Sequence, residues 1–232
     1  MLCALLDTSG CFIAFGLATD EGPTAAATHP HTKENACSIA DLFRWFLDQS
    51  GCEPGRLTHF AVGVGPGTFI GTRTGIAFAN GFAVSRGLPM VAVGSLRAVA
   101  AGAFMRGCRP VCVRWARRNS FYAGIYESDQ SLPPQARTLQ AVFEEEVPET
   151  ELAALVQRVH QSSRQSGDLR ILADDRRALE AMSAAECPVG MSFELVPGFL
   201  DLWGMALLVT NAISAGDVDQ FVDALYFRSA VP

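Results

Sequence analysis

Apolar and polar positions predict an alternation of strands and helices along the first part of the chain. Residues 2–7 and 11–18 are almost continuously apolar on either side of a short Thr-Ser-Gly turn, which is typical of two adjacent strands. The unbroken apolar run of residues 2–6 indicates that the first of these strands is buried on both faces. Residues 57–64 and 89–94 predict two further strands.

Residues 33–49 predict an amphipathic helix that ends at Gly51. Trp45 is unusual in this helix, because it lies on the polar side together with serine and aspartate residues. The apolar side is formed by six residues at helical spacing, namely Ala36, Ile39, Leu42, Phe43, Phe46 and Leu47.

A second predicted helix, residues 72–86, is apolar around nearly its whole circumference, which indicates that it is buried on nearly all sides. Asn80 is its only polar residue between Gly75 and Val84. Four small residues at steps of four form a smooth stripe, called here the small-residue ridge. The ridge consists of Gly71, Gly75, Ala79 and Ala83. We expect one side of this helix to meet the sheet and another to meet a second chain.

The glycine-rich stretch that links the strand 57–64 to this helix reads GPGTFIGTRTG and covers residues 65–75. A strand, a glycine-rich turn and a helix are a common arrangement for an anion site. The spacing matches neither standard phosphate loop. Ile70 stands where a P-loop has its second glycine, and Thr68 stands where a dinucleotide fold has its third. An anion site and a tight turn without a ligand both remain open.

The second part of the chain is predicted to begin near residue 106, after a strand and a helix that Ser95 caps and that ends near Met105. Residues 110–116 and 120–127 predict a hairpin, and residues 128–150, with their prolines and acidic run, predict a variable connection. Four elements follow: a helix at 151–160, a strand at 169–173, and helices at 175–184 and 199–215.

Composition describes a well-cored globular protein, with 49% hydrophobic and 18% charged residues among 232. No apolar run reaches the length of a membrane span, and the N-terminus lacks the basic region of a signal peptide. Seven cysteines without a C-x-x-C pair indicate reduced, mostly buried thiols in a cytoplasmic protein.

The formal charge of −6 makes the chain a poor stand-alone RNA binder, because phosphate contacts need lysine and arginine. The local exception is a cluster of arginines, interpreted either as a solvated surface or as a contact for RNA or an acidic partner. It comprises Arg106, Arg109, Arg114, Arg117 and Arg118.

Several segments together resemble the TsaB (YeaZ) family, the non-catalytic partner of the enzyme that forms threonylcarbamoyladenosine in tRNA. The glycine-rich stretch is similar to the family signature GPGSFTGLRIG. Shorter matches run along the chain in the same order, at residues 5–9 (LLDTS), 31–34 (HTKE), 88–96 (LPMVAVGSL) and 226–228 (YFR).

The resemblance implies an α/β, two-lobed actin/Hsp70/hexokinase-like (ASKHA) fold with mixed sheets flanked by helices. Residues 1–105 form the first lobe and residues 106–232 a smaller second lobe, whose helix near 199–215 is expected to pack back on the first. The family's catalytic relative, TsaD, carries two metal-binding histidines near residue 95, where this chain has Ser95 and Val99. Trp115 stands where the family has the aspartate of its D-A-R motif.

We therefore expect no catalytic residue, no metal and no required cofactor, with at most weak or vestigial binding of ATP or ADP. The residues expected to face such a nucleotide are Asp7, Thr8, Ser9, Gly65, Gly67 and Thr68. The alternative is an ATP-using, kinase-like member of the same fold, which the retained Asp7 favours and Trp115 opposes.

The resemblance implies a scaffold that binds TsaD and supports transfer of the threonylcarbamoyl group to tRNA. A TsaE-like ATPase is the expected further partner. When alone the chain is expected to form a homodimer, and it should meet tRNA only within the complex and no membrane. The expected partner interface lies on the two helices of the first lobe. It comprises Ala36, Ile39, Phe43, Trp45, Gly71, Arg73, Gly75, Ile76, Ala79, Asn80 and Ala83.

Overall fold

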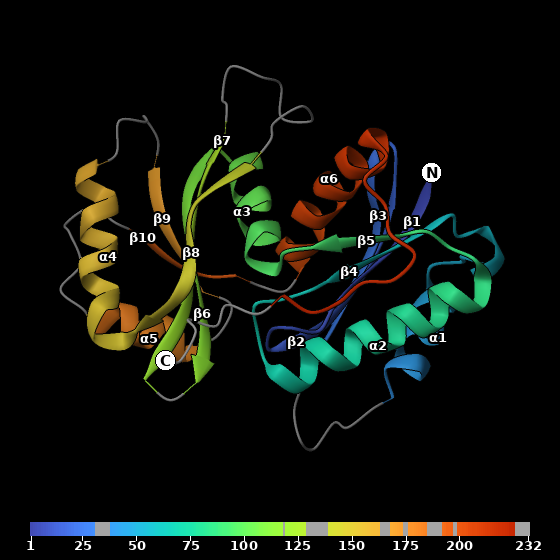
Figure 1. The fold of residues 1–232 in the computed structure, drawn as a ribbon, viewed down its shortest axis with the longest axis horizontal. Helices are drawn as coiled ribbons and strands as arrows, with labels where there is room; N and C mark the ends of the chain where they lie inside the picture. The colour runs from blue at the N-terminus through green and yellow to red at the C-terminus, as the bar shows by residue number, and fades with distance from the viewer. Residues whose placement is uncertain are drawn as a thin grey trace.

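The computed structural model contains two five-stranded mixed sheets with helices around and between them, which confirms the predicted fold class (Figure 1). The structure describes residues 1–30, 38–117, 119–128, 139–162, 168–173, 176–184, 192–196 and 199–225. No helix among these residues is long and apolar enough to cross a membrane.

The first sheet has the order β3-β2-β1-β4-β5, with β1 antiparallel to β2 and parallel to β4. Helices α1 and α2 cover one face of it (Figure 1). The strands are β1 (Leu2–Asp7), β2 (Phe12–Thr19), β3 (Gly22–Pro30), β4 (His59–Gly63) and β5 (Met90–Val93). The helices are α1 (Ile39–Gln49), the 3-10 turn Pro54–Arg56 and α2 (Phe69–Arg86).

Strand β1 is buried on both faces, as its sequence predicts. Ala4 and Leu6 join the core beneath α1 and α2, whereas Cys3 and Leu5 join a separate core beneath α6. All four side chains are fully buried. Phenylalanines fill the core under α1 and α2, where the Phe43 ring centroid lies 5.2 Å from that of Phe82.

The second sheet has the order β10-β9-β6-β7-β8, and all its strands follow helix α3 in the chain. Its strands are β6 (Cys108–Arg117), β7 (Ser120–Ser128), β8 (Leu139–Pro148), β9 (Asp168–Ala173) and β10 (Ser192–Leu195). The remaining helices are α3 (Ser95–Met105), α4 (Glu149–Ser162), α5 (Arg176–Ala184) and α6 (Phe199–Ala215).

Helices α3 and α6 lie between the two sheets (Figure 1). Helix α6 packs on β1, β2, β3 and β5 of the first sheet, and α3 packs on β6 and β7 of the second. The two helices approach closely at Gly204, where a Cβ atom would collide with the backbone of Ala98. The α3–α6 pair thus joins the two halves of the molecule.

Several elements differ from the sequence-based expectation. Strands β3 and β10 were not predicted, and neither was β8, because residues 128–150 were expected to be a variable connection. Helix α2 begins at Phe69 and not at residue 72. Ser95 is the first residue of α3 and not its cap, and the cap position belongs to Gly94. Helix α1 is described from Ile39, so the predicted start at residues 33–37 lies outside the described residues.

Candidate functional site

The turn between β1 and β2 is built from three buried polar residues. The Asp7 Oδ1 atom accepts hydrogen bonds from the backbone N–H of Ser9, at 2.8 Å, and from the Ser9 hydroxyl. The Thr8 hydroxyl donates to the carbonyl oxygen of Gly71 at 2.7 Å. Because all three residues are at most 3% exposed, the turn is an internal structure of the lobe.

The glycine-rich stretch wraps around this turn and leaves it no spare room. A Cβ atom added to Gly63 would lie less than 3.0 Å from the Asp7 carboxylate. A Cβ atom at Gly67 would collide with the backbone of Ser9, and one at Gly71 with the backbone of Thr8. A Cβ atom at Gly75 would collide with the Thr8 hydroxyl. These four glycines therefore serve a close backbone approach, which is one of the uses for which only glycine is suited.

Two backbone donors of the stretch are already used within the chain. The Thr68 N–H donates to the Ser9 carbonyl at 2.8 Å, and the Gly65 N–H donates to the Ser95 hydroxyl at 3.3 Å. An anion site at a helix start needs such N–H groups directed at the ligand. Of the two interpretations left open by the sequence, the geometry favours the tight turn.

Arg114 connects this cluster to the second sheet. Its guanidinium Nη1 donates to the Ser9 hydroxyl and, at 3.0 Å, to the carbonyl oxygen of Pro66. The Ser9 and Ser95 hydroxyls lie 2.9 Å apart. Arg114 is 2% exposed, although it belongs to β6 on the other side of the cleft. A single arginine among the apolar residues 110–116 was the available signal in the sequence.

The arginine cluster is not one surface, which corrects the interpretation made from the sequence. Arg114 is buried, whereas Arg117 is exposed and pairs with Glu146 on β8. Arg106 pairs with Glu194 at 2.8 Å, and its guanidinium holds the pKa of that carboxyl below its usual range. Arg118 lies outside the described residues.

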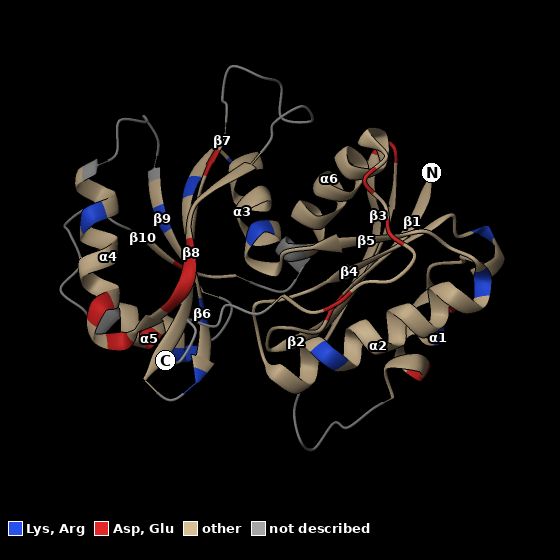
Figure 2. Cartoon of the chain, viewed as in Figure 1, with Lys and Arg blue, Asp and Glu red and all other residues tan. Residues whose placement is uncertain are grey.

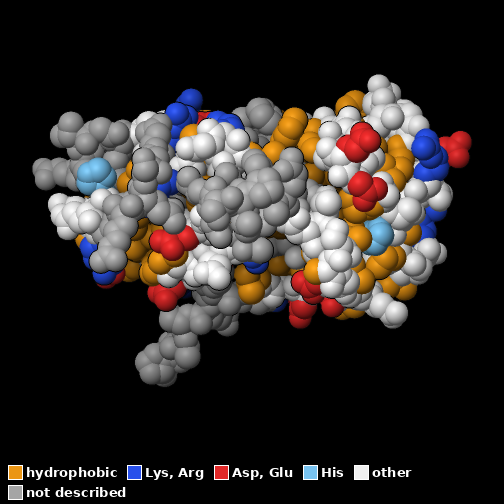
Figure 3. All heavy atoms as spheres, turned by 90° about the horizontal axis from the view of Figure 1, so that it is seen from above, with side chains coloured by type: hydrophobic (Ala, Val, Ile, Leu, Met, Phe, Trp, Pro, Cys, Tyr) orange, Lys and Arg blue, Asp and Glu red, His pale blue; other side chains and the backbone are white. Residues whose placement is uncertain are grey.

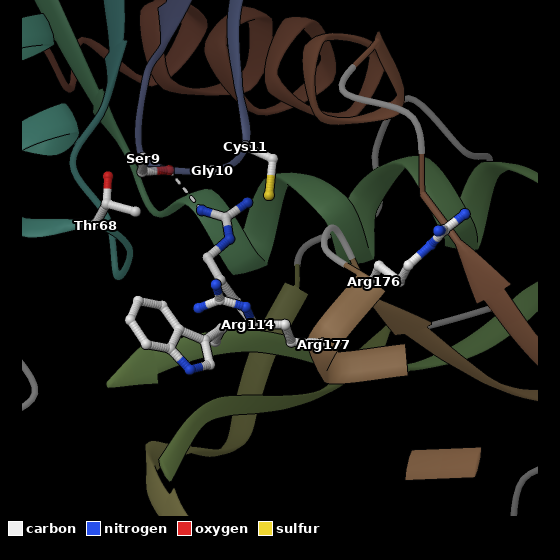
Figure 4. Close-up of a pocket in the computed structure, with 8 residues that line it drawn as sticks. Ser9, Gly10, Cys11, Thr68, Arg114, Arg176 and Arg177 are labelled. Atoms are coloured by element: carbon white, nitrogen blue, oxygen red, sulfur yellow. Dashed lines mark hydrogen bonds between the residues drawn. The ribbon is translucent and has the colours of Figure 1, made fainter. Parts of the chain in front are cut away.

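A pocket of about 300 Å³ opens beside Arg114, between the two halves of the molecule (Figure 4). Figure 4 shows the Arg114 side chain directed from β6 toward Ser9. The Arg177 guanidinium lies 5.3 Å from the centroid of the Trp115 ring. The pocket is lined by Ser9, Gly10, Cys11, Thr68, Arg114, Trp115, Arg176 and Arg177.

The residues at this cleft do not fit a magnesium nucleotide, the group that the fold implies. Asp7 is 3% exposed, and its Oδ1 atom is bonded to Ser9. Trp115 lies in the pocket wall at the position where the family carries an aspartate. Among the described residues, no three His, Cys, Asp or Glu side chains come together to hold a metal ion.

The small-residue ridge lies on the inner side of α2, which contradicts its expected place at a partner contact. Gly71 and Gly75 face the Thr8 turn, while Ala79 and Ala83 are fully buried in the core under α1 and α2. Small residues permit close approach, and here the approach is to the chain's own first sheet. Ile76, 6% exposed, belongs to the same core.

Asn80 is also buried, by the segment 217–225 that follows α6, called here the C-terminal strap. Its amide group donates to the Val222 carbonyl at 2.8 Å and accepts from the Val222 N–H at 3.0 Å. The strap further pairs Asp219 with Met90 at the outer edge of β5 and bonds Leu225 to Val64. The one polar residue of the apolar part of α2 therefore anchors the chain's own strap.

Other residues expected at the interface remain accessible. Trp45 is 54% exposed, Arg73 is exposed beside the Phe69 ring, and Ile39 is partly buried. Phe43 is 2% exposed, although it lines a groove between α1 and α2. Ala36 lies outside the described residues.

The outer side of α2 is the apolar surface that the sequence did not single out. Ile70 and Val84 are 75% and 65% exposed, and the exposed Ala77 and Gly81 lie between them at helical spacing. Figure 2 shows charged positions on α2 only near its two ends. We call these four residues the outer face of α2.

Comparisons with known proteins agree on the family. The model for TsaD, tRNA N6-adenosine threonylcarbamoyltransferase, matches residues 27–156. The tRNA threonylcarbamoyladenosine biosynthesis protein TsaB of Escherichia coli is 28% identical over 142 residues, which span 60% of this chain and 60% of that protein. The chain thus aligns with less than two thirds of this curated relative.

Solved structures show the same fold. A Pseudomonas aeruginosa protein with similarity to peptidase YEAZ has a TM-score of 0.75 at 20% identity, covering 98% of this chain and 99% of its own. The activator of 2-hydroxyisocaproyl-CoA dehydratase from Clostridium difficile has a TM-score of 0.52 at 10% identity, covering 93% and 97%. These likenesses confirm the predicted actin/Hsp70/hexokinase-like architecture. The family model, which matches more than half of the chain, shows that the chain belongs to the TsaD-type family.

Proposed function

We propose that this chain is a non-catalytic subunit of the system that makes N6-threonylcarbamoyladenosine in tRNA, and that it binds and supports a TsaD-like catalytic subunit. Similarity to the Escherichia coli TsaB protein carries the proposal, since that protein is named for this biosynthesis. The site geometry supports the non-catalytic part. The Ser95 hydroxyl is hydrogen-bonded within the polar cluster around Ser9, and Val99 is 3% exposed in an apolar core.

The contact with the catalytic subunit is proposed on the outer face of α2 and the adjoining groove toward α1. The groove has a volume of about 340 Å³ and an aromatic floor that includes Phe78 and Phe82. Charged residues of α1, Asp41 and Arg44 among them, form part of its lining. An apolar centre with a polar rim is the usual anatomy of a protein interface. In the absence of TsaD, the same surface is proposed to pair with a second copy of this chain.

Contacts with the ATPase and with tRNA are proposed to occur only in the assembled complex. In the space-filling view from above, the basic side chains of the described residues are scattered and form no broad patch on that face (Figure 3). Non-specific binding of nucleic acid depends on many such contacts with phosphates. The ATP-using alternative gains no support from the cleft, because the residues there do not fit a magnesium nucleotide.

Two alanines of α2, two positions apart, provide the test. Ala77 is exposed on the outer face, whereas Ala79 is fully buried. Ala77→Glu should leave the chain folded and should weaken TsaD capture and self-association at least about 30-fold, because a carboxylate in a dry interface costs about 2 kcal/mol or more. Ala79→Glu should instead prevent folding.

Association is measured by sedimentation and by pull-down with the TsaD of the same organism, with circular dichroism as the check of folding. Ala154→Glu, the same change at an exposed alanine of α4, controls for charge alone. Trp45→Ala reports whether the contact extends to α1. A folded Ala77→Glu chain that binds TsaD like the parent would exclude the outer face of α2. Failure to capture TsaD by the parent chain would contradict the proposed function itself.

A further inference from the structure

We propose that Arg114 is an internal latch between the two lobes, and that its guanidinium holds the cleft closed without a ligand. The inference goes beyond the proposed function and does not depend on it. The latch would make the arrangement of the lobes independent of nucleotide, in a fold whose cleft is otherwise suited to one.

The hydrogen bonds of Arg114 cross the cleft. The side chain starts on β6 of the second sheet, and both acceptors of its Nη1 atom belong to the first lobe. The Ser9 hydroxyl is part of the β1–β2 turn, and the Pro66 carbonyl is part of the glycine-rich turn. One guanidinium therefore holds both turns that border the cleft.

The buried charge is compensated through Ser9. A hydroxyl carries one proton, and Ser9 donates it to the Asp7 carboxylate while its oxygen accepts from Arg114. The positive and negative groups are thus joined by one bridging hydroxyl among buried side chains. A buried charge is tolerated when it is paired and hydrogen-bonded in this way, and its partner groups are left unsatisfied when it is removed.

The same contacts engage groups that a phosphate would use on the first lobe. The Ser9 hydroxyl accepts from Arg114, and the Gly65 N–H donates to the Ser95 hydroxyl. The second sheet also meets the first lobe through the apolar core around α3 and through a hydrogen bond from the Arg97 guanidinium to the Leu139 carbonyl at 2.6 Å. Arg114 is the polar attachment that borders the pocket.

The test compares two arginines three positions apart on β6. Arg114→Met removes the guanidinium from the latch, while Arg117→Met removes the one that pairs with Glu146 at the surface. Amide exchange followed by mass spectrometry on the full-length chain should become about tenfold faster in peptides covering residues 7–11 and 64–68 for Arg114→Met, as expected for losing hydrogen bonds to a charged group. Arg117→Met should leave these peptides unchanged.

Rescue distinguishes a latch from a general loss of packing. Guanidinium ion at low millimolar concentration should restore protection in Arg114→Met, and sodium ion at equal ionic strength should not. Arg114→Lys keeps the positive charge but lacks the planar guanidinium group. Its amides in the two turns should show intermediate protection against exchange, and this comparison remains available if Arg114→Met does not fold. Magnesium ATP should change exchange in neither turn of the parent chain.

The latch is refuted if Arg114→Met and Arg117→Met exchange alike at both turns. It is also refuted if Arg114→Lys is as well protected as the parent chain, or if magnesium ATP protects the β1–β2 turn of the parent chain. None of these outcomes bears on TsaD capture, so the proposed function stands or falls separately.

Discussion

The close contact between α2 and the β1–β2 turn leads to a measurable difference between two identical substitutions in one helix. Gly75 and Gly81 both lie within α2. A Cβ atom at Gly75 would collide with the Thr8 hydroxyl and lie 3.2 Å from the Thr8 Cβ, whereas nothing lies within 4 Å of a Cβ at Gly81. Gly75→Ala and Gly81→Ala therefore test the contact directly.

The expected magnitude follows from terms that partly cancel. Replacing glycine with alanine inside a helix gains about 1 kcal/mol at both positions. At Gly75 the added methyl group overpacks a buried turn, which costs about 1–3 kcal/mol. It also displaces the Thr8 hydroxyl from the Gly71 carbonyl, a hydrogen bond worth about 1 kcal/mol. The gain in helix propensity is the same at both positions and cancels in the comparison. The Gly81→Ala chain should therefore be more stable than the Gly75→Ala chain by about 2–4 kcal/mol.

Urea unfolding followed by tryptophan fluorescence measures this difference, and thermal unfolding should show it as a gap of about 4–16 °C for a chain of this size. Thr8→Ala provides the coupling control, because it removes the hydroxyl with which the new methyl group collides. Thr8→Ala should destabilise the Gly75→Ala chain less than it destabilises the parent chain. If the two glycine substitutions stabilise equally, the proposed reason for glycine in this motif is wrong.

Two further predictions concern the strap and the thiols. Asn80→Ala removes both hydrogen bonds to Val222 and should cost about 2 kcal/mol, with faster proteolysis of the C-terminal strap; unchanged cleavage there would show that Asn80 does not anchor it. Burial raises the pKa of the Cys3 thiol to about 12. A thiol reagent at neutral pH should therefore modify the exposed Cys11 quickly and Cys3 only upon unfolding, which peptide mapping would reveal. Rapid labelling of Cys3 in the folded chain would contradict the burial of this strand.

The elements of the first lobe were predicted correctly from the sequence where burial leaves a clear pattern of apolar residues. The continuous apolar run of β1 and the phenylalanines of α1 report burial directly, so their elements were recognised. Strand β3 was missed because the residues that it packs against the core under α1 and α2 are Ala25 and Ala27. Alanine does not favour strands, so the alternation along β3 gave little signal.

Strand β8 was missed for an electrostatic reason. Its run of three glutamates reads as a solvated connection when the sequence stands alone. In the structure the charges meet partners across the sheet. Glu146 pairs with Arg117 and accepts from Ser120, and Glu144 accepts from the Tyr126 hydroxyl at 2.7 Å. Partners that come from a neighbouring strand cannot be recognised before the strand pairing is known.

The candidate site shows the same limit in the glycine-rich motif. The spacing of its glycines identifies a close approach, but not the group that is approached. The structure supplies that group as the Asp7-Thr8-Ser9 turn, against which Gly67, Gly71 and Gly75 all pack. The glycine-rich motif and the Asp7-Thr8-Ser9 turn are thus the two sides of one internal contact. Packing between them is a sufficient reason for both motifs to occur together. A member of the family can therefore keep both motifs without binding a nucleotide, and Arg114 bonded to that contact across the cleft is consistent with such a role.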